Sequence, residues 1–143
     1  YFLFIIYIVT GSINPQIIIE IIFTIWIFDT FSYLGGKIFG GKKLIPKISS
    51  GKTISGLVIG ILSTLILTQT YIMIFKEISI NIILYTILVI IFSFIGDFFA
   101  SLLKRVSDVK DSGSIMPGHG GLLDRFDSFI GVFFIFGIAL VFL

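Results

Sequence analysis

Long apolar stretches alternate with short polar segments along most of the chain. Three stretches, residues 16–34, 54–75 and 79–103, have the length of a membrane-crossing helix, which needs ~20 residues to span about 30 Å of hydrocarbon. Two shorter apolar stretches, 1–9 and 128–143, stand at the chain ends. The pattern predicts an all-α, polytopic bundle of transmembrane helices, with spans at about 16–34, 54–75, 79–103 and 128–143 and a partial span at 1–9.

The composition supports a membrane protein. Apolar residues make up 57% of the 143 residues and charged residues only 13%, which is too little polar surface to coat a water-soluble core. The chain has no cysteine, so disulfides, thiolate metal sites and thiol nucleophiles are excluded. Because the chain enters an apolar stretch directly from Tyr1, we expect its start to be the cut end of a longer protein.

The charges collect in two glycine-rich loops, 35–53 and 104–127. Loop 35–53 carries five lysines and no acid, and cytoplasmic loops are enriched in Lys and Arg. Two crossings separate the loops, so both are predicted on the cytoplasmic face. The basic surplus favours anions there, and the glycines would let the backbone approach a polyphosphate.

Two acids, Asp29 and Asp97, lie toward the cytoplasmic ends of their predicted spans. An ionisable group at membrane depth costs roughly 2.5–3.5 kcal/mol, so each calls for a partner or a function. If the 79–103 helix continues, one face carries Asp97, Ser101, Lys104, Asp108 and Asp111. A helix end whose charges pair with each other is the structural alternative for the last part of this face.

Asp124 and Asp127, three residues apart, open the last predicted span. They could serve as N-terminal dipole partners. Together with Asp97, however, these acids beside basic loops suggest a hard divalent cation held by oxygen ligands, with basic groups left for phosphates. His119 could be a proton shuttle, a metal ligand or a phosphate hydrogen-bond donor, and we favour the donor role.

The segment SSGKT, residues 49–53, resembles the end of a P-loop. The first glycine of that motif would fall at Pro46, and we expect no strand before it. The sequence therefore excludes a P-loop NTPase.

The stretch SLLKRVSDVKDSGSIMPGHGGLLDRFD, residues 101–127, resembles the signature of the phosphatidate cytidylyltransferase family. That signature reads S-x-x-K-R, four residues, K-D-x-G, then P-x-H-G-G-x-x-D-R-x-D. Its fixed positions are filled by Ser101, Lys104, Arg105, Lys110, Asp111, Gly113, Pro117, His119, Gly120, Gly121, Asp124, Arg125 and Asp127. Residues 28–56 are similar to the family's preceding block, and the resemblance implies the C-terminal, catalytic transmembrane part of a larger enzyme.

The chain departs from the family pattern at several positions. Ala100 and Ser55 stand where glutamates are usual, Ser50 replaces a proline, and Ser32 precedes Tyr33 in place of alanine. These changes leave the group of Asp97, Asp124 and Asp127 intact.

The resemblance implies transfer of CMP from CTP to phosphatidate, which yields CDP-diacylglycerol and pyrophosphate. It implies Asp97 and Asp124 as Mg²⁺ ligands, with Asp127 and Asp111 as second candidates. The implied phosphate-stabilising and donor residues are Lys104, Arg105, Lys110, Arg125, His119 and Ser101. The implied substrate-binding residues are Asp29, Tyr33, Lys52, Thr53, Gly120 and Gly121.

Other functions remain open at this point. A polyprenol kinase or another CDP-lipid synthase would use the same cation and phosphate groups. A non-catalytic transport protein would line a pathway with Asp29 and Asp97. Nucleic-acid binding is not expected, because the basic residues form no aromatic-lined groove. We expect a multi-pass protein of the bacterial inner membrane with its site facing the cytoplasm; a homodimer is left open.

Overall fold

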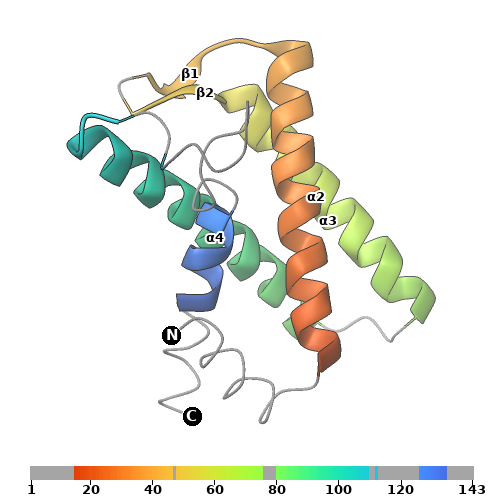
Figure 1. Cartoon of the computed structure of the whole chain (residues 1–143). Helices are drawn as coiled ribbons and strands as arrows, with labels where there is room; N and C mark the ends of the chain where they lie inside the picture. Colours follow the sequence, from red (N-terminus) through yellow and green to blue (C-terminus); the bar gives the residue numbers. More distant parts are fainter. Residues whose placement is uncertain (1–14, 47, 76–79, 110–111, 113–125, 135–143) are drawn as a thin grey trace.

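The computed structural model describes residues 15–46, 48–75, 80–109, 112 and 126–134 (Figure 1). In this part of the chain the elements are α2 (Pro15–Phe39), β1 (Lys43–Ile45), β2 (Ser49–Thr53), α3 (Ile54–Phe75) and α4 (Ile80–Val106). Residues 126–134 are also helical and are blue in Figure 1. The predicted partial span 1–9, and the part of the last predicted span beyond residue 134, lie outside the described residues.

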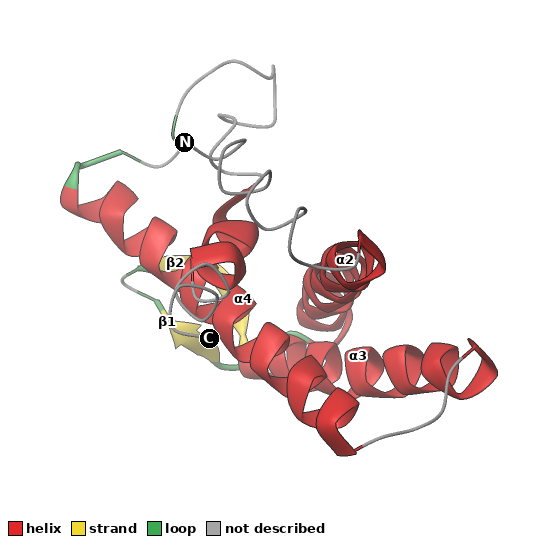
Figure 2. Ribbon diagram, turned by 90° about the horizontal axis from the view of Figure 1, so that it is seen from below, coloured by secondary structure: helices red, strands yellow, loops and turns green. Residues whose placement is uncertain are grey.

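The all-α prediction is confirmed for the three central spans. The segments Ile18–Phe39, Ile54–Ile74 and Ile83–Val106 are long and apolar enough to cross a membrane. α3 has the predicted bounds, whereas α2 continues five residues past the predicted end at 34 and α4 three residues past 103. In Figure 2 α2 is seen close to end-on while α3 and α4 are seen from the side, so α2 is inclined to both.

The lysine-rich loop after the first span is not irregular throughout. β1 and β2 form an antiparallel pair in which Lys43 lies opposite Thr53 and Ile45 opposite Ser49. The SSGKT segment is itself β2, and β1 ends directly before Pro46, so the expectation that no strand precedes the motif was wrong. Pro46 still occupies the place of the first P-loop glycine, so the exclusion of that motif is unchanged.

Glycine conformation ends α2 and turns the chain into this hairpin. Gly40 has φ 57° and its N–H donates to the Gly36 carbonyl at 3.1 Å. Gly41 follows with φ 96°. This is the αL type of helix C-terminus, in which a left-handed residue without a Cβ satisfies a carbonyl of the last turn.

α4 ends in a similar way, but with an aspartate in the left-handed position. Asp108 has φ 54°, its N–H donates to the Arg105 carbonyl at 3.1 Å, and the Val109 N–H donates to the Lys104 carbonyl at 2.9 Å. This is a Schellman motif. α4 therefore ends before Asp108, and the condition under which Asp108 would share the face of Asp97 is not met. Asp111 lies outside the described part.

Small residues bring α2 and α3 into backbone contact. A Cβ added at Gly56 would lie 2.5 Å from the Ser32 carbonyl oxygen and 3.1 Å from the Gly36 nitrogen. One turn later, a Cβ at Gly60 would meet the Ser32 hydroxyl. Such close approach through small residues is a common way for helices to associate in membranes, where lipid removes the hydrophobic drive for association.

A second close crossing joins α4 to the helical residues 126–134. A Cβ added at Gly96 would lie 2.7 Å from both the Gly131 Cα and the Asp127 carbonyl oxygen. Beside this crossing the two elements and α2 share a buried cluster of Ile21, Ile25, Val89, Phe129 and Val132. The crossing places the helical residues 126–134 directly against the C-terminal half of α4.

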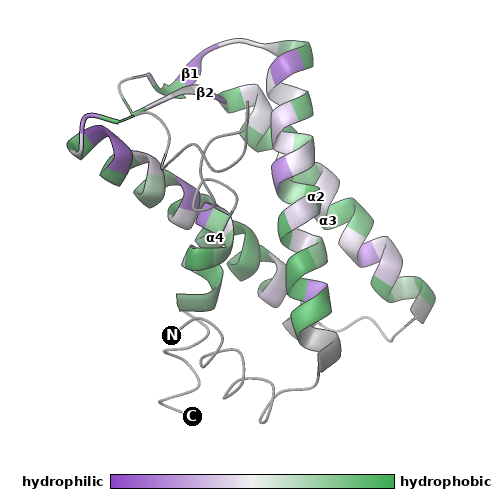
Figure 3. Ribbon diagram, in the orientation of Figure 1, coloured by the Kyte–Doolittle hydropathy of each residue, from purple (hydrophilic) through white to green (hydrophobic). Residues whose placement is uncertain are grey.

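The hairpin lies at the end of the helices where α2 stops, α3 starts and α4 stops (Figure 1). Hydrophilic positions gather at the same end, shown in purple in Figure 3. Arg105 fastens the hairpin to α4, because its Nε donates to the Ile48 carbonyl at 3.1 Å. The same guanidinium donates to the Val109 carbonyl at 3.1 Å.

We expect Gly56→Ala to lower the free energy of unfolding in detergent by about 1–3 kcal/mol, because the new Cβ would press against the α2 backbone. Gly51→Ala is the matched control, since no atom lies within 4 Å of its added Cβ. Its stability should stay within about 0.5 kcal/mol of the parent protein. Equal denaturation curves for the two variants would contradict the close crossing.

Arg105→Met keeps an aliphatic side chain but removes both hydrogen bonds to backbone carbonyls. Because a net hydrogen bond is worth about 1 kcal/mol, we expect amide hydrogens of residues 43–53 to exchange roughly five- to tenfold faster. Hydrogen-exchange mass spectrometry measures this directly. Val106→Ala, at a side chain that is 75% exposed, serves as the control. Unchanged exchange in the Arg105 variant would show that the contact does not hold the hairpin.

Candidate functional site

A cavity of about 360 Å³ lies at the hairpin end of the helices. All five labelled elements and the helical residues 126–134 contribute to its wall. Its charged lining residues are Asp29, Lys52, Asp97 and Asp127, and its hydroxyl-bearing ones are Ser32, Tyr33, Thr53 and Ser128. Six predicted site residues in the described part thus line one space: Asp29, Tyr33, Lys52, Thr53, Asp97 and Asp127.

Lys52 and Asp97 form an ion pair across this cavity. β2 presents Lys52 to α4, where its Nζ contacts the Asp97 carboxylate. The same Nζ lies 5.3 Å from the centre of the Phe94 ring, one helical turn before Asp97. A predicted metal ligand and a predicted phosphate-binding lysine, 45 residues apart in the chain, therefore meet in the structure.

Asp127, one of the helical residues 126–134, stands beside this pair. Its Oδ1 accepts a hydrogen bond from the Ser128 N–H at 2.9 Å, and its Oδ2 lies 3.9 Å from the Lys104 Nζ. Burial, and then the neighbouring Asp97 carboxylate, raise the pKa of Asp127 well above its usual range. Crowded carboxylates of this kind favour the binding of a proton or a cation.

Asp29 completes a group of three carboxylates supplied by three different helices. It lies on α2 next to the Ser128 side chain and interacts electrostatically with Asp97 and Lys52. The cavity thus sets three acids against the lysine of the hairpin, with Lys104 at its edge. Acids and lysines in one space can bind a phosphate-bearing ligand together with a cation.

Two of the carboxylates in this cavity could hold a divalent cation together with a bound phosphate. Among the residues that the structure describes, no three His, Cys, Asp or Glu side chains lie close enough together to hold a metal ion. Mg²⁺ is usually bound through one or two carboxylates plus substrate phosphates. Asp97 and Asp127 could supply those carboxylates, whereas Asp124 and Asp111, the other predicted ligands, lie outside the described residues.

Thr53 and Tyr33 border the same cavity in different ways. The Thr53 Oγ1 accepts the Gly56 N–H at 3.1 Å, so it caps the N-terminus of α3. Ser55, which stands in place of the family's usual glutamate, contacts the Thr53 hydroxyl at 3.1 Å and donates to the Gly40 carbonyl. Tyr33 is 65% exposed, and the Lys37 Nζ lies 5.9 Å from its ring centre.

The remaining predicted site residues divide into two groups. Lys104 lies beside Asp127, Arg105 contacts hairpin backbone, and Ser101 is half-buried on α4. Lys110, Asp111, His119, Gly120, Gly121, Asp124 and Arg125 lie outside the described residues.

Sequence reasoning missed several residues of the cavity wall, among them Phe94, Ser128 and Ser32. Phe94 lies three residues before Asp97, so helical spacing could have placed both on one face. Ser128 follows Asp127 directly and could have been included with it. Ser32 occupies the place of an alanine in the family pattern, and no sequence signal pointed to its hydroxyl as part of the wall.

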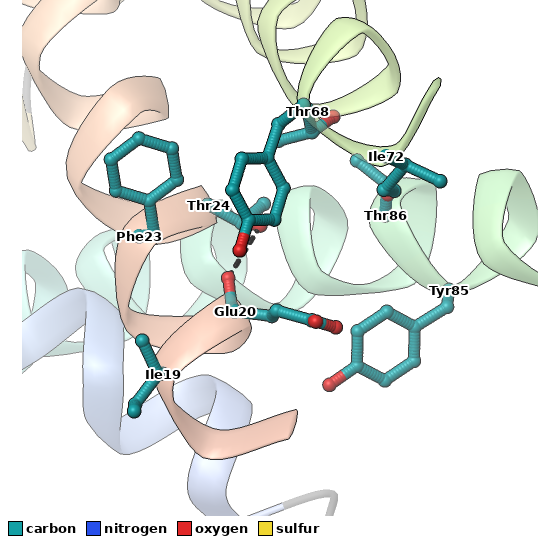
Figure 4. Close-up of a pocket in the computed structure, with 9 residues that line it drawn as sticks. Ile19, Glu20, Phe23, Thr24, Thr68, Ile72, Tyr85 and Thr86 are labelled. Carbon is teal, nitrogen blue, oxygen red and sulfur yellow. Dashed lines mark hydrogen bonds between the residues drawn. The ribbon is translucent and has the colours of Figure 1, made fainter. Parts of the chain in front are cut away.

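A smaller cavity of about 150 Å³ lies farther from the hairpin, among α2, α3 and α4 (Figure 4). Figure 4 shows the Glu20 side chain pointing toward Tyr85, and the Thr24 hydroxyl donates to the Glu20 carbonyl at 2.7 Å. Its described lining holds one acid and no lysine or arginine. The combination of acids and lysine thus occurs at the cavity of about 360 Å³, which is the candidate site.

Comparison with known proteins identifies the family of the chain. The sequence pattern of the cytidylyltransferase family matches residues 1–143. The chain is 41% identical over 135 residues to the phosphatidate cytidylyltransferase of Staphylococcus haemolyticus, covering 92% of this chain and 52% of that protein. It is 45% identical over 114 residues to the enzyme of the same name from Bacillus subtilis, covering 76% of this chain and 41% of that protein.

The chain spans about half the length of the curated relatives it matches. The match nevertheless runs through all the elements that build the candidate site, from α2 to the helical residues 126–134. The resemblance inferred from the 101–127 signature is therefore confirmed, and the chain belongs to the cytidylyltransferase family.

Proposed function

We propose that this protein transfers CMP from CTP to phosphatidate and releases pyrophosphate. The observation that carries the proposal is the cavity in which Asp29, Asp97 and Asp127 face Lys52 at the hairpin end of apolar helices. Membership of the cytidylyltransferase family supports the reaction type. The names of the relatives support phosphatidate as the acceptor.

In this reaction an oxygen of the lipid phosphate attacks the α-phosphorus of CTP. The new P–O bond forms as the bond to the β-phosphate bridge oxygen breaks, and pyrophosphate leaves with that electron pair. No protein nucleophile is required. The protein's contribution is to hold two anionic substrates in line and to offset their charge.

The hairpin is our proposed binding element for the nucleotide phosphates. Lys52 would exchange its contact with Asp97 for a phosphate oxygen, because a phosphate group offers the ammonium more acceptors than one carboxylate. Gly51, whose Cα faces open space, lets the strand backbone come close to the phosphates. Thr53 stays on its capping contact and fixes the start of α3.

We propose Mg²⁺ as the cation, held by Asp97 and Asp127 in the described part of the site. When bound, it would neutralise phosphate charge and so lower the cost of bringing two anions together. Asp124 and Asp111 are the further proposed ligands. Lys104 would stabilise the lipid phosphate from the side of Asp127. Lys110, Arg125 and His119 are proposed to contact the pyrophosphate.

The site is proposed to face the cytoplasm of a bacterial inner membrane. The hairpin end carries Lys37, Lys42, Lys43 and Lys52, together with Lys104 and Arg105 at the end of α4. An excess of lysine and arginine marks cytoplasmic loops. In this orientation CTP arrives from the cytosol, and the lipid head group arrives within the inner leaflet.

The acceptor that reacts with CTP distinguishes the proposed reaction from its alternatives. Membranes from cells that express the protein, given labelled CTP and Mg²⁺, should form CDP-lipid with phosphatidate and not with a polyprenol, and EDTA should abolish the product. Release of CDP together with a phosphorylated alcohol would identify a polyprenol kinase instead. No turnover with either acceptor would contradict the proposed enzyme and favour a transport protein.

Asp97→Asn and Asp127→Asn should each reduce CMP transfer by about a hundredfold or more, because each removes a charge that offsets phosphates or holds the cation. Asp108→Asn is the matched control. Asp108 is exposed and left-handed, a conformation that asparagine accepts well, so its activity should equal that of the parent. Activity above a tenth of the parent level in both site variants would overturn their assignment.

A further inference from the structure

A second large cavity lies on the other side of the crossing between α4 and the helical residues 126–134. Its volume is about 540 Å³, within the range of about 300–1,000 Å³ typical of ligand pockets. Most of its wall is apolar. The large apolar side chains that line it are Phe92, Ile95, Phe99, Leu103, Ile130 and Phe134. We refer to it as the α4 groove.

Small residues make room for this groove. Gly96 and Gly131, where the two helices touch, line it, and so does Ala100 one turn further along α4. Around this floor, Ile95, Phe99 and Phe134 are 48%, 57% and 66% exposed. A floor of small residues between large apolar side chains leaves room for an alkyl chain, and the apolar lining matches the bilayer interior.

The groove has one polar end, and that end leads to the candidate site. Lys104 and Ser112 are its polar lining residues in the described part. The Lys104 Nζ lies 3.9 Å from Oδ2 of Asp127, and Asp127 lines the cavity that also holds Asp29, Lys52 and Asp97. The two cavities therefore adjoin at the pair of Lys104 and Asp127, one side apolar and the other charged.

We infer that the α4 groove binds an acyl chain of the phosphatidate acceptor, with the lipid phosphate held at Lys104 beside Asp127. The inference rests on the proposed function and names where its lipid substrate lies. It follows from complementarity: the occupant must be apolar over most of its length and anionic at one end, which describes a phosphate-headed lipid. Such a lipid could enter sideways from the inner leaflet without leaving the apolar phase.

The geometry also separates the two substrates. A lipid in the α4 groove approaches Lys104 from one side of the Gly96–Gly131 crossing, whereas the hairpin residue Lys52 faces Asp97 from the other cavity. Filling the groove should therefore impair binding of the lipid and leave binding of the nucleotide unchanged. The experiment therefore compares the effect of a substitution on the KM for the lipid with its effect on the KM for the nucleotide.

The test is Ala100→Trp in the full-length membrane protein, with Ile91→Trp as the matched control. Ile91 lies nine residues earlier on α4, so it occupies the opposite face of the helix, and it is exposed there. We expect the groove variant to raise the KM for dioleoyl phosphatidate roughly tenfold, with the KM for CTP unchanged. With dihexanoyl phosphatidate the increase should be much smaller. The control should match the parent in both constants.

Labelling with a phosphatidate that carries a photoreactive diazirine in its acyl chain tests occupancy without turnover. In membranes, the label should attach to α4 between Ile95 and Leu103 in the parent protein and be lost in Ala100→Trp. Such labelling in a protein that fails to convert phosphatidate would uphold the groove and overturn the proposed function. If the Trp variant does not fold, Leu103→Trp takes its place.

Three results would overturn the inference. One is a KM for phosphatidate that changes equally in Ala100→Trp and Ile91→Trp. Another is a rise in the KM for CTP as large as that for the lipid, which would indicate a general distortion of the site. The third is absence of label from α4 in an active parent protein, which would indicate that another part of the protein covers the groove.

Discussion

The ion pair between Lys52 and Asp97 is the contact on which the arrangement of the site depends. Asp97 lies within a helix long and apolar enough to cross a membrane, where an unpaired carboxylate is costly. Lys52, on strand β2, offsets that charge. Without this contact, β1 and β2 would form a short, exposed hairpin. The same contact holds the hairpin over the helix ends and keeps two functional side chains in one cavity. A pair of this kind can be exchanged for a phosphate and a cation without leaving either charge unpartnered.

Close helix crossings build the site around the Lys52–Asp97 pair. Gly56 and Gly60 let α3 approach α2 near Ser32, while Gly96 and Gly131 let the last helix approach α4. Since apolar side chains gain little by leaving lipid for protein, backbone contact and polar interactions must hold these helices together. The second crossing has a functional result, because it sets Asp127 beside Asp97. It also divides the space around α4 into a charged cavity and an apolar groove.

This division suits an enzyme whose two substrates come from different phases. The hairpin and the three carboxylates form the wall on the polar side, and Phe99 with its neighbours forms it on the apolar side. Lys104 stands where the two meet. In the proposed reaction the polar side receives the nucleotide and the apolar side receives the lipid, so neither has to cross an environment unsuited to it.

Much of this could be predicted from the amino-acid sequence, and for identifiable reasons. Membrane spans follow from local hydropathy, so α2, α3 and α4 were placed to within a few residues. The fixed spacing of the 101–127 signature identified the family, and the lysines of loop 35–53 marked the segment that contributes Lys52 to the candidate site. The strands were missed because a five-residue segment such as SSGKT has no alternating apolar pattern. Whether α4 continues through Asp108 was left open, and it does not, because Asp108 adopts the left-handed conformation.

Tertiary structure alone decided which of these residues meet. Residues distant in sequence meet where two backbones can touch, as Ser32 and Gly60 do at a helix crossing, or where the hairpin meets a helix, as Lys52 and Asp97 do. The hydropathy of the sequence does not encode that pairing. The α4 groove has the same origin, since it is a space between helices. Local physical chemistry thus determined the spans, the charged loops and the candidate chemistry, whereas packing of non-neighbouring backbones decided the shape of the site.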